Sequence, residues 1–259
     1  MATLELDGAQ LVYEVEGDGA HTLAFAHGWC SKMAHWDAQV ERFRSSHRIV
    51  RWDRRGMGRS RTDTLAASPS RHGDDLAAIL DAAGIERVTV AGHAGGGPTA
   101  LAFAADHPDR TEGLILVDTT VHAVAAPGEP DELAASVRRS AEKLTTVGEP
   151  YFRRLYATFF GHRAPADVVA DAIDNAVATP LELAASEMLH LVGDTAAYAA
   201  RVRCPVLWVS AIPGDTALAQ RCFDDVMVGH VVGSGHFVQL EVPEQCNAMI
   251  AAFLADKVH

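Results

Sequence analysis

Four short glycine-rich segments contain the residues of this sequence that are best suited to chemistry. They are His27-Gly28-Trp29, residues 53–60, Gly92-His93-Ala94-Gly95-Gly96 and Gly235-His236-Phe237. The third segment is a sharp turn between an apolar run and a helical pattern. Such a turn either binds phosphate with the amides that begin the helix or pushes its middle side chain into a pocket. Here the middle residue is Ala94, whose methyl group has no lone pair and cannot attack a substrate.

Each of these segments follows a short apolar run that predicts a buried strand. We expect strands at residues 2–6, 10–16, 22–26, 48–52, 87–91, 113–118, 205–210 and 226–232. Helical spacing of apolar residues predicts helices near 35–43, 72–83, 98–106, 131–146, 150–161, 165–177, 180–191, 215–223 and 243–256. Strands that alternate with helices indicate a mainly parallel sheet covered on both faces, and ligands bind at the carboxyl ends of such strands.

The strand signal disappears between residues 121 and 200, where only helical patterns follow one another. A helical insertion between two strands of a parallel sheet is typical of a lid. We therefore expect a core domain from residues 1–120 and 201–259 and a helical lid, or cap, from residues 121–200. A chain of 259 residues needs no second core domain.

Composition and charge exclude several classes of function. The net charge of −12, without a run of Lys or Arg, repels polyanions, so we expect no nucleic acid partner. No apolar stretch approaches the roughly 20 residues of a membrane helix, and the first residues lack the pattern of a signal peptide. We expect no membrane partner and a cytoplasmic location. The four cysteines form no CxxC pair and the 13 histidines no HExxH motif, so no metal and no cofactor are expected.

The four segments together resemble those of the α/β-hydrolase fold superfamily, in the family's order and at its spacing. Gly92 to Gly96 resembles the G-x-S-x-G nucleophile elbow, His27-Gly28-Trp29 the oxyanion loop, residues 53–60 the D-x-x-G-x-G-x-S turn, and Gly235-His236-Phe237 the terminal histidine loop. The elbow looks most like that of haloperoxidase-type and proline-iminopeptidase-type esterases. The resemblance implies a mostly parallel eight-stranded central sheet with helices on both faces and a helical lid inserted after strand six.

The resemblance also implies roles for individual residues. His236 matches the general base, Ala94 stands at the nucleophile position where serine is expected, and the amides of Trp29 and Gly95 match the oxyanion hole. For the catalytic acid we favour Asp215, which follows the predicted strand 205–210, over Asp118, at the end of strand 113–118. Substrate-binding residues are expected among Trp29, His93, Tyr151 and Tyr156.

Ala94 leaves more than one hypothesis open. In the first, serine is the natural residue and this chain is an inactive variant of an enzyme that hydrolyses an ester, a lactone or a related acyl compound. In the second, Ala94 is native and a His–Asp dyad acts as a general base, in a cofactor-independent dioxygenase or a lyase. The segment His27-Gly28-Trp29-Cys30 resembles the corresponding loop of the cofactor-independent dioxygenases of this fold. In the third, the protein is a non-catalytic ligand-binding or sensor protein. The partner expected is a small-molecule substrate, and a homo-oligomer is left open.

Overall fold

The predicted strands pair into one sheet in the computed structural model, which describes residues 1–65, 68–126, 129–211 and 216–258. The sheet order is β1-β2-β4-β3-β6-β7-β8-β9, and the two-residue β5 pairs with β2. The strands from β3 onward along this path pair in parallel, whereas β1, β2 and β5 pair antiparallel. Their bounds are β1 Ala2–Leu6, β2 Ala9–Glu16, β3 Thr22–Ala26, β4 Arg48–Trp52, β5 Arg61–Thr62, β6 Val88–His93, β7 Thr111–Val117, β8 Val206–Ser210 and β9 Val226–His230. The predicted fold class is confirmed.

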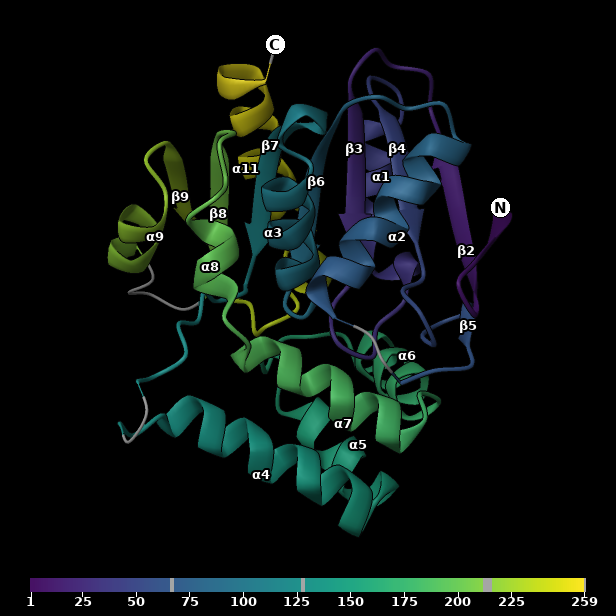
Figure 1. Ribbon diagram of the computed structural model, residues 1–259, viewed down its shortest axis with the longest axis vertical. Coiled ribbons are helices and arrows are strands. Elements are labelled where there is room, and N and C mark those ends of the chain that lie inside the picture. Colours follow the sequence, from purple (N-terminus) through teal and green to yellow (C-terminus); the bar gives the residue numbers. More distant parts are fainter. Residues whose placement is uncertain (66–67, 127–128, 212–215, 259) are drawn as a thin grey trace.

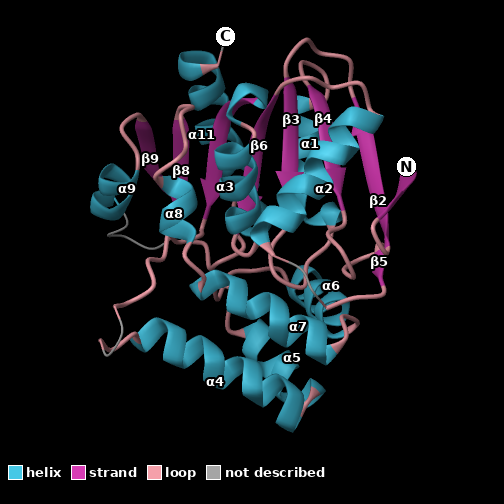
Figure 2. Ribbon diagram, viewed as in Figure 1, coloured by secondary structure: helices cyan, strands magenta, loops and turns pink. Residues whose placement is uncertain are grey.

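Alternation along the central strands divides the core into two layers. In β3, every residue is buried, with Leu23 and Phe25 on one face of the sheet and Ala24 and Ala26 on the other. The first face packs against α1 (Asp37–Phe43) and α11 (Pro243–Lys257), and the second against α2 (Pro69–Ala82) and α3 (Gly96–Asp106). This double burial explains why the strand is an uninterrupted apolar run. Figure 2 shows helices on both sides of the sheet.

The remaining helices follow β7 and β8. They are α4 Glu132–Val147, α5 Glu149–Ala157, α6 Ala166–Val177, α7 Leu181–Leu189, α8 Thr195–Ala199, α9 Thr216–Cys222 and α10 Val238–Glu241, with 3-10 turns η1 Met33–Trp36, η2 Pro108–Arg110 and η3 His190–Val192. None of the described helices has the length and apolarity that a membrane span requires.

Helices α4 to α7 form a separate layer across the carboxyl ends of the parallel strands (Figure 1). Their apolar faces share a third core cluster with Trp29, Cys30 and Phe237 of the sheet domain. The short α8 differs from them, because Ala199 packs in the cluster that contains α2 and α3. The cap layer therefore ends before α8, although the predicted lid runs to residue 200.

One predicted cap helix is shorter than its sequence pattern. The aromatic spacing predicts a helix near 150–161, but α5 ends at Ala157. Beyond it, the carbonyl of Phe159 accepts a hydrogen bond from the amide of His236, 2.7 Å away. The Phe159 carbonyl thus makes a tertiary contact with the loop that carries His236. The local pattern of apolar residues does not reveal such a contact.

The turn between β6 and α3 imposes the tightest steric constraint near these strand ends. A Cβ atom on Gly92 would fall on the backbone carbonyl of Gly96, which cannot rotate away as a side chain does. We predict that Gly92→Ala lowers the free energy of unfolding by about 1–3 kcal/mol, measured by urea denaturation. Gly193→Ala is the control, because its Cβ would lie an ordinary 3.5 Å from the carbonyl oxygen of His190. Equal losses in the two variants would contradict the steric explanation.

Candidate active site

The turn after β6 holds Ala94 in an unusual backbone conformation. Its φ angle is +47°, in the left-handed region that residues with a Cβ rarely adopt. The Ala94 amide donates to the carbonyl of Val117 at 3.0 Å, and the Ala94 carbonyl accepts from Thr119 Oγ1 at 2.9 Å. These bonds tie the strained residue to β7 and to the loop after it. Strain at one side chain that projects into a cavity is a recognised mark of a functional turn.

His236 pairs with Asp118 at the edge of the same cavity. Its Nδ1 lies 2.6 Å from Asp118 Oδ2, and the amide of Ala211 donates to Asp118 Oδ1 at 2.8 Å. Burial acts to raise the pKa of Asp118, but the hydrogen bond and the charge of His236 outweigh it, and the net shift is downward. An ionised carboxylate in this position orients the imidazole and stabilises its protonated form.

The residue paired with His236 is not the acid that the sequence analysis favoured. Asp215, the favoured acid, lies outside the described residues, whereas Asp118, the alternative, occupies the hydrogen-bonding position next to His236. Asp118 also has a positive φ of 43°, which turns the chain sharply at the end of β7. Sequence alone does not separate the two loops, because each carboxylate follows a buried parallel strand.

The loop that carries His236 is held by hydrogen bonds to its backbone, in addition to the bond from the His236 amide to Phe159. The carbonyl of His236 accepts from His93 Nε2 at 2.8 Å. Glu241, which was not predicted as a site residue, accepts hydrogen bonds from the amides of Gly235 at 3.0 Å and Phe237 at 3.2 Å. Its carboxylate also accepts from the amide of Gly161 in the cap at 2.9 Å. His236 is therefore supported from both the core and the cap.

His93 has a structural position and not a chemical one. It is fully buried, and its Nδ1 has no hydrogen-bond partner. Burial and the neighbouring His236 lower the pKa of His93 to about 3, so the ring is neutral at physiological pH. Its ring borders the cavity but its one hydrogen bond goes to the backbone of His236. A substrate in the cavity would therefore contact the His93 ring without a hydrogen bond from it.

The amides of Trp29 and Gly95 belong to two turns that approach each other closely. A Cβ atom on Gly95 would be only 2.9 Å from the Trp29 amide nitrogen, so glycine allows the two turns to touch. Within the described residues, neither amide donates to a protein acceptor. Two free N–H groups beside a general base are what a developing oxyanion requires.

The loop from Gly28 to Ser31 is supported from beneath by His27 and Arg54. His27 Nε2 accepts from the Arg54 amide at 2.8 Å, which leaves its Nδ1–H to donate to the Gly28 carbonyl at 2.9 Å. Burial, and then the charge of Arg54, keep the pKa of His27 well below its usual value. The ring is therefore neutral, with its tautomer set by these two bonds.

The turn at residues 53–60 is also structural. The Asp53 carboxylate accepts from the amide of Met33 at 2.7 Å and from that of Arg59 at 2.8 Å. Ser60 Oγ donates to the Asp53 carbonyl at 2.6 Å. This motif closes a loop below the site and contributes no group to the cavity.

A cavity of about 380 Å³ joins the elbow, the base and the cap. Its walls are mostly aromatic and aliphatic, and its lining residues are Trp29, Ser31, His93, Ala94, Gly95, Asp118, Thr119, Thr120, Leu133, Val137, Tyr156, Phe159, Met188, Leu191, Val192, His236 and Phe237. The His93 ring in this lining is neutral because its pKa is about 3, and burial raises the pKa of Tyr156 further above its usual value. Asp118, whose pKa is lowered, is already paired with His236. The cavity suits an uncharged, largely apolar molecule.

Of the four residues predicted to bind substrate, Trp29, His93 and Tyr156 line this cavity and Tyr151 does not. Trp29 and Tyr156 form part of its wall. Tyr151 lies outside the lining, where it packs within the cap and Lys143 Nζ sits 5.8 Å from its ring centre. The prediction for Tyr151 is wrong because five residues separate it from Tyr156, which turns the two side chains about 140° apart on one helix.

Cys30 also stays outside the cavity lining. It is fully buried, and burial raises the pKa of its thiol well above the usual value. The cysteine of the His27-Gly28-Trp29-Cys30 loop therefore supplies no nucleophile. Its side chain packs in the core cluster shared with the cap.

These features agree with the comparisons with known proteins. The sequence pattern of the alpha/beta hydrolase fold matches residues 22–163, more than half of the chain. The chain belongs to the alpha/beta hydrolase fold family. This confirms the resemblance drawn from the four motifs.

Two relatives of this α/β hydrolase illustrate its position in the family. It is 39% identical over 112 residues to a Caulobacter sp. (strain K31) protein named "Putative carbamate hydrolase RutD", which is 42% of each chain. It is 32% identical over 135 residues to a bifunctional esterase/perhydrolase from Acinetobacter calcoaceticus, 51% of this chain and 49% of that one. The matches thus span about half the length of these relatives or less.

Solved structures extend the likeness over the whole fold. An enol-lactonase from Burkholderia xenovorans LB400 superposes with a TM-score of 0.84 and 23% identity, covering 98% of this α/β hydrolase and 100% of the enol-lactonase. A thermophilic esterase from Thermogutta terrifontis gives a TM-score of 0.82 at 24% identity, covering 95% and 93%. At these identities the likeness shows the fold alone.

The buried histidine His35 predicts that the fold loses stability in acid. His35 is 3% exposed, its ring nitrogens have no partner, and burial followed by the charge of Lys32 lowers its pKa to about 4. The folded pKa lies below the unfolded value of 6.5, so the unfolded chain binds this proton first as the pH falls. The stability that the neutral ring contributes is complete above pH 6.5 and is lost as the pH falls toward 4.

We predict that His35→Phe makes the loss of unfolding free energy between pH 6.5 and 4.5 less steep, by up to about 1.4 kcal/mol per pH unit. Urea denaturation at several pH values measures this slope. His162→Phe is the control, because His162 is exposed and its replacement is expected to leave the slope unchanged. A slope that His35→Phe does not alter would contradict the buried neutral state of His35.

Proposed function

We propose that this protein hydrolyses an uncharged ester, lactone or carbamate by general-base activation of water. The observation that carries the proposal is the convergence of His236, paired with Asp118, and the Trp29 and Gly95 amides on one apolar cavity. The relatives named carbamate hydrolase and esterase support an ester-like substrate. Acyl compounds of these kinds share the carbonyl that a pair of amide donors would stabilise.

In the proposed reaction, His236 Nε2 takes a proton from a water molecule as the water oxygen attacks the carbonyl carbon. The carbonyl oxygen gains negative charge and accepts hydrogen bonds from the Trp29 and Gly95 amides. His236, now protonated and stabilised by Asp118, returns the proton to the leaving group as its bond to carbon breaks. No covalent intermediate forms, because Ala94 offers no nucleophile.

The absence of a nucleophile limits the rate but leaves the other contributions in place. Hydrolase sites without a complete triad retain roughly 10³–10⁴-fold acceleration over water from the oxyanion hole and from binding. This suits a reactive acyl compound better than a stable ester. The mostly apolar walls add selectivity for a neutral substrate, since a charged group against them would lose its hydration.

The retained machinery also supports the hypothesis that alanine replaces a serine. The elbow conformation, the base, the acid and the free amides are all in the arrangement that a serine at position 94 would use. A single substitution, Ala94→Ser, separates the mechanism with water as nucleophile from the mechanism with serine as nucleophile. Water attack and serine attack would use the same cavity and the same substrate class.

We predict that Ala94→Ser hydrolyses p-nitrophenyl acetate or butyrate with a burst of p-nitrophenolate equal to the enzyme concentration. The chain with Ala94 is expected to show a slow linear rate without a burst, because it forms no acyl-enzyme. Stopped-flow absorbance measures both phases. The double variant Ala94→Ser, His236→Ala is the control and is expected to lose the burst.

An Ala94→Ser protein with no esterase activity would contradict the hydrolase proposal. Tight binding of the ester without turnover in both forms would instead indicate a ligand-binding protein. Oxygen uptake with a hydroxylated heteroaromatic compound, abolished by His236→Ala, would instead indicate the dioxygenase reading.

The choice of acid is tested in the same background. We predict that Asp118→Asn lowers kcat of the Ala94→Ser enzyme by roughly 10³–10⁴-fold, since an amide neither orients nor stabilises the imidazolium as a carboxylate does. Asp215→Asn is the matched control and is expected to change kcat by less than about tenfold. Steady-state ester hydrolysis measures both. The reverse ranking would assign the acid to Asp215.

A further inference from the structure

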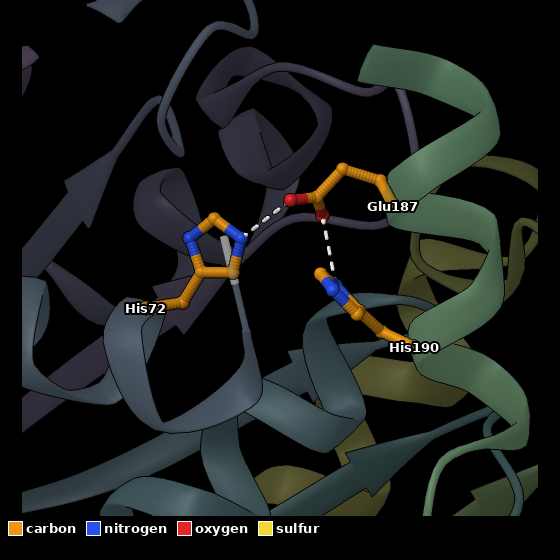
Figure 3. Close-up of side chains that lie close together, drawn as sticks. All are labelled: His72, Glu187 and His190. Atoms are coloured by element: carbon orange, nitrogen blue, oxygen red, sulfur yellow. Dashed lines mark hydrogen bonds and ion pairs between the residues drawn. The ribbon is translucent and has the colours of Figure 1, made fainter. Parts of the chain in front are cut away.

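A buried charge cluster joins the cap to the core directly behind the oxyanion loop. Glu187, on α7, is 3% exposed and accepts from Arg54 Nη1 at 2.9 Å and from His72 Nε2 at 2.8 Å. Figure 3 shows the Glu187 carboxylate reaching from α7 toward His72 on α2, with His190 below it. Burial acts to raise the pKa of Glu187, but His72 and Arg54 outweigh it and lower the pKa well below its usual value. The carboxylate is therefore ionised and paired.

Arg54 connects this carboxylate to the oxyanion loop. While Nη1 binds Glu187, its Nε donates to the His27 carbonyl at 3.1 Å and its Nη2 to the Gly28 carbonyl at 3.0 Å. The next residue is Trp29, whose amide faces the candidate oxyanion site. A guanidinium has a rigid planar fork, so fixing one nitrogen on Glu187 also fixes the direction of the other two.

The same face of α7 makes a second contact with the loop. The Trp29 indole Nε1 donates to the carbonyl of Ala184 at 2.7 Å. Ala184 and Glu187 are three residues apart and lie on one side of the helix, and Met188, on the same side, lines the cavity. One helix therefore forms part of the substrate wall and holds the loop at two points.

Two further cap helices complete the support. Tyr156 Oη, from α5, donates to the Trp29 carbonyl at 3.2 Å, and Asn175 Nδ2, from α6, donates to the Cys30 carbonyl at 3.0 Å. Cys30 itself has a positive φ of 49°. A strained loop that accepts hydrogen bonds from two cap helices and donates one to a third depends on the cap for its shape.

We propose that Glu187 is a positioning residue, which acts through Arg54 to keep the Gly28–Ser31 loop, and with it the Trp29 amide, in the geometry that an oxyanion hole needs. This inference rests on the proposed hydrolytic function for its catalytic meaning. Glu187 does not line the cavity and touches no substrate. It acts by keeping the Trp29 amide in position to donate to the developing oxyanion of the transition state.

A metal ion is the competing explanation for this cluster. The ligand atoms of His72, Glu187 and His190 lie within 4.8 Å of one another, close enough to bind one ion. However, the single negative charge of Glu187 is already balanced by Arg54, whose guanidinium is 1% exposed. A divalent cation would meet that buried positive charge, and the second carboxylate beside His72, that of Asp75, is already paired with Arg55. The cluster is therefore better suited to pairing than to metal binding.

The test is Glu187→Gln, which removes the charge and keeps the side-chain shape. We expect the Trp29 indole N–H and the Ser31 amide to exchange with solvent at least about tenfold faster, while Val90 in β6 changes by less than about twofold. Nuclear magnetic resonance hydrogen exchange measures these rates. In the Ala94→Ser background, kcat for a p-nitrophenyl ester is expected to fall about tenfold with KM within about twofold, because the loss is confined to the transition state.

Glu182→Gln is the matched control, because Glu182 is an exposed glutamate on the same helix and its replacement is expected to change neither readout. The double variant Arg54→Met, Glu187→Met separates positioning from simple stability. Removing both charges leaves no unpaired buried ion, so its unfolding free energy is expected to exceed that of Glu187→Gln. The loop protons are still expected to exchange fast, since the bonds to the His27 and Gly28 carbonyls are gone.

Native-like exchange of the Trp29 and Ser31 protons in either Glu187→Gln or the double variant would overturn the proposal. Recovery of kcat together with stability in the double variant would do the same, because it would show a merely structural role. An Ala94→Ser protein that hydrolyses no ester contradicts the proposed function alone. The exchange measurements need no turnover and decide separately whether Glu187 holds the loop.

Discussion

The close approach of three backbone turns at the carboxyl ends of β3, β6 and β7 is the constraint on which the rest of this site depends. Gly95 can lie against the Trp29 amide only because it has no side chain, and Gly96 lies against the carbonyls that end β3 for the same reason. Thr119, after β7, closes the third side by its bond to the Ala94 carbonyl. Main-chain packing therefore brings the Gly95 turn against the Trp29 amide and fixes the residue at position 94. Side chains then hold the Trp29 loop from behind, where Arg54 binds the carbonyls of His27 and Gly28.

Much of this arrangement was predictable because it is encoded locally. Apolar runs of five or six residues defined the parallel strands, and the glycine turns after them marked the edge where Trp29, Gly95 and His236 meet. Two strand ends were less well predicted. The strand expected at 226–232 ends at His230, and the one expected at 87–91 continues to His93, because pairing with β7 extends it into the turn. Both differences arise from neighbours in space.

The contacts that the sequence did not reveal are those between distant segments. Asp118 and Asp215 each follow a strand, and only the fold brings Asp118 to His236. Neither Glu241 nor Glu187 was predicted as a site residue, yet one binds three amides and the other pairs with a buried arginine. The signal that could have found Glu187 is a charged residue within an apolar helical face, between Ala184 and Met188. Such a residue requires a buried partner that local pattern does not identify.

The hydrogen bonds between the cap and the oxyanion loop have a consequence for how this family can change its substrates. A cap inserted between two strands is usually regarded as an exchangeable module, since it can vary while the sheet stays constant. Here α5, α6 and α7 each hold part of the loop that carries Trp29. Cap and core are therefore structurally coupled in this protein. A cap transplanted from a relative would bring its own pocket and would also have to supply these three contacts, whereas point changes at Leu133, Val137 or Met188 alter the cavity wall and leave the contacts in place.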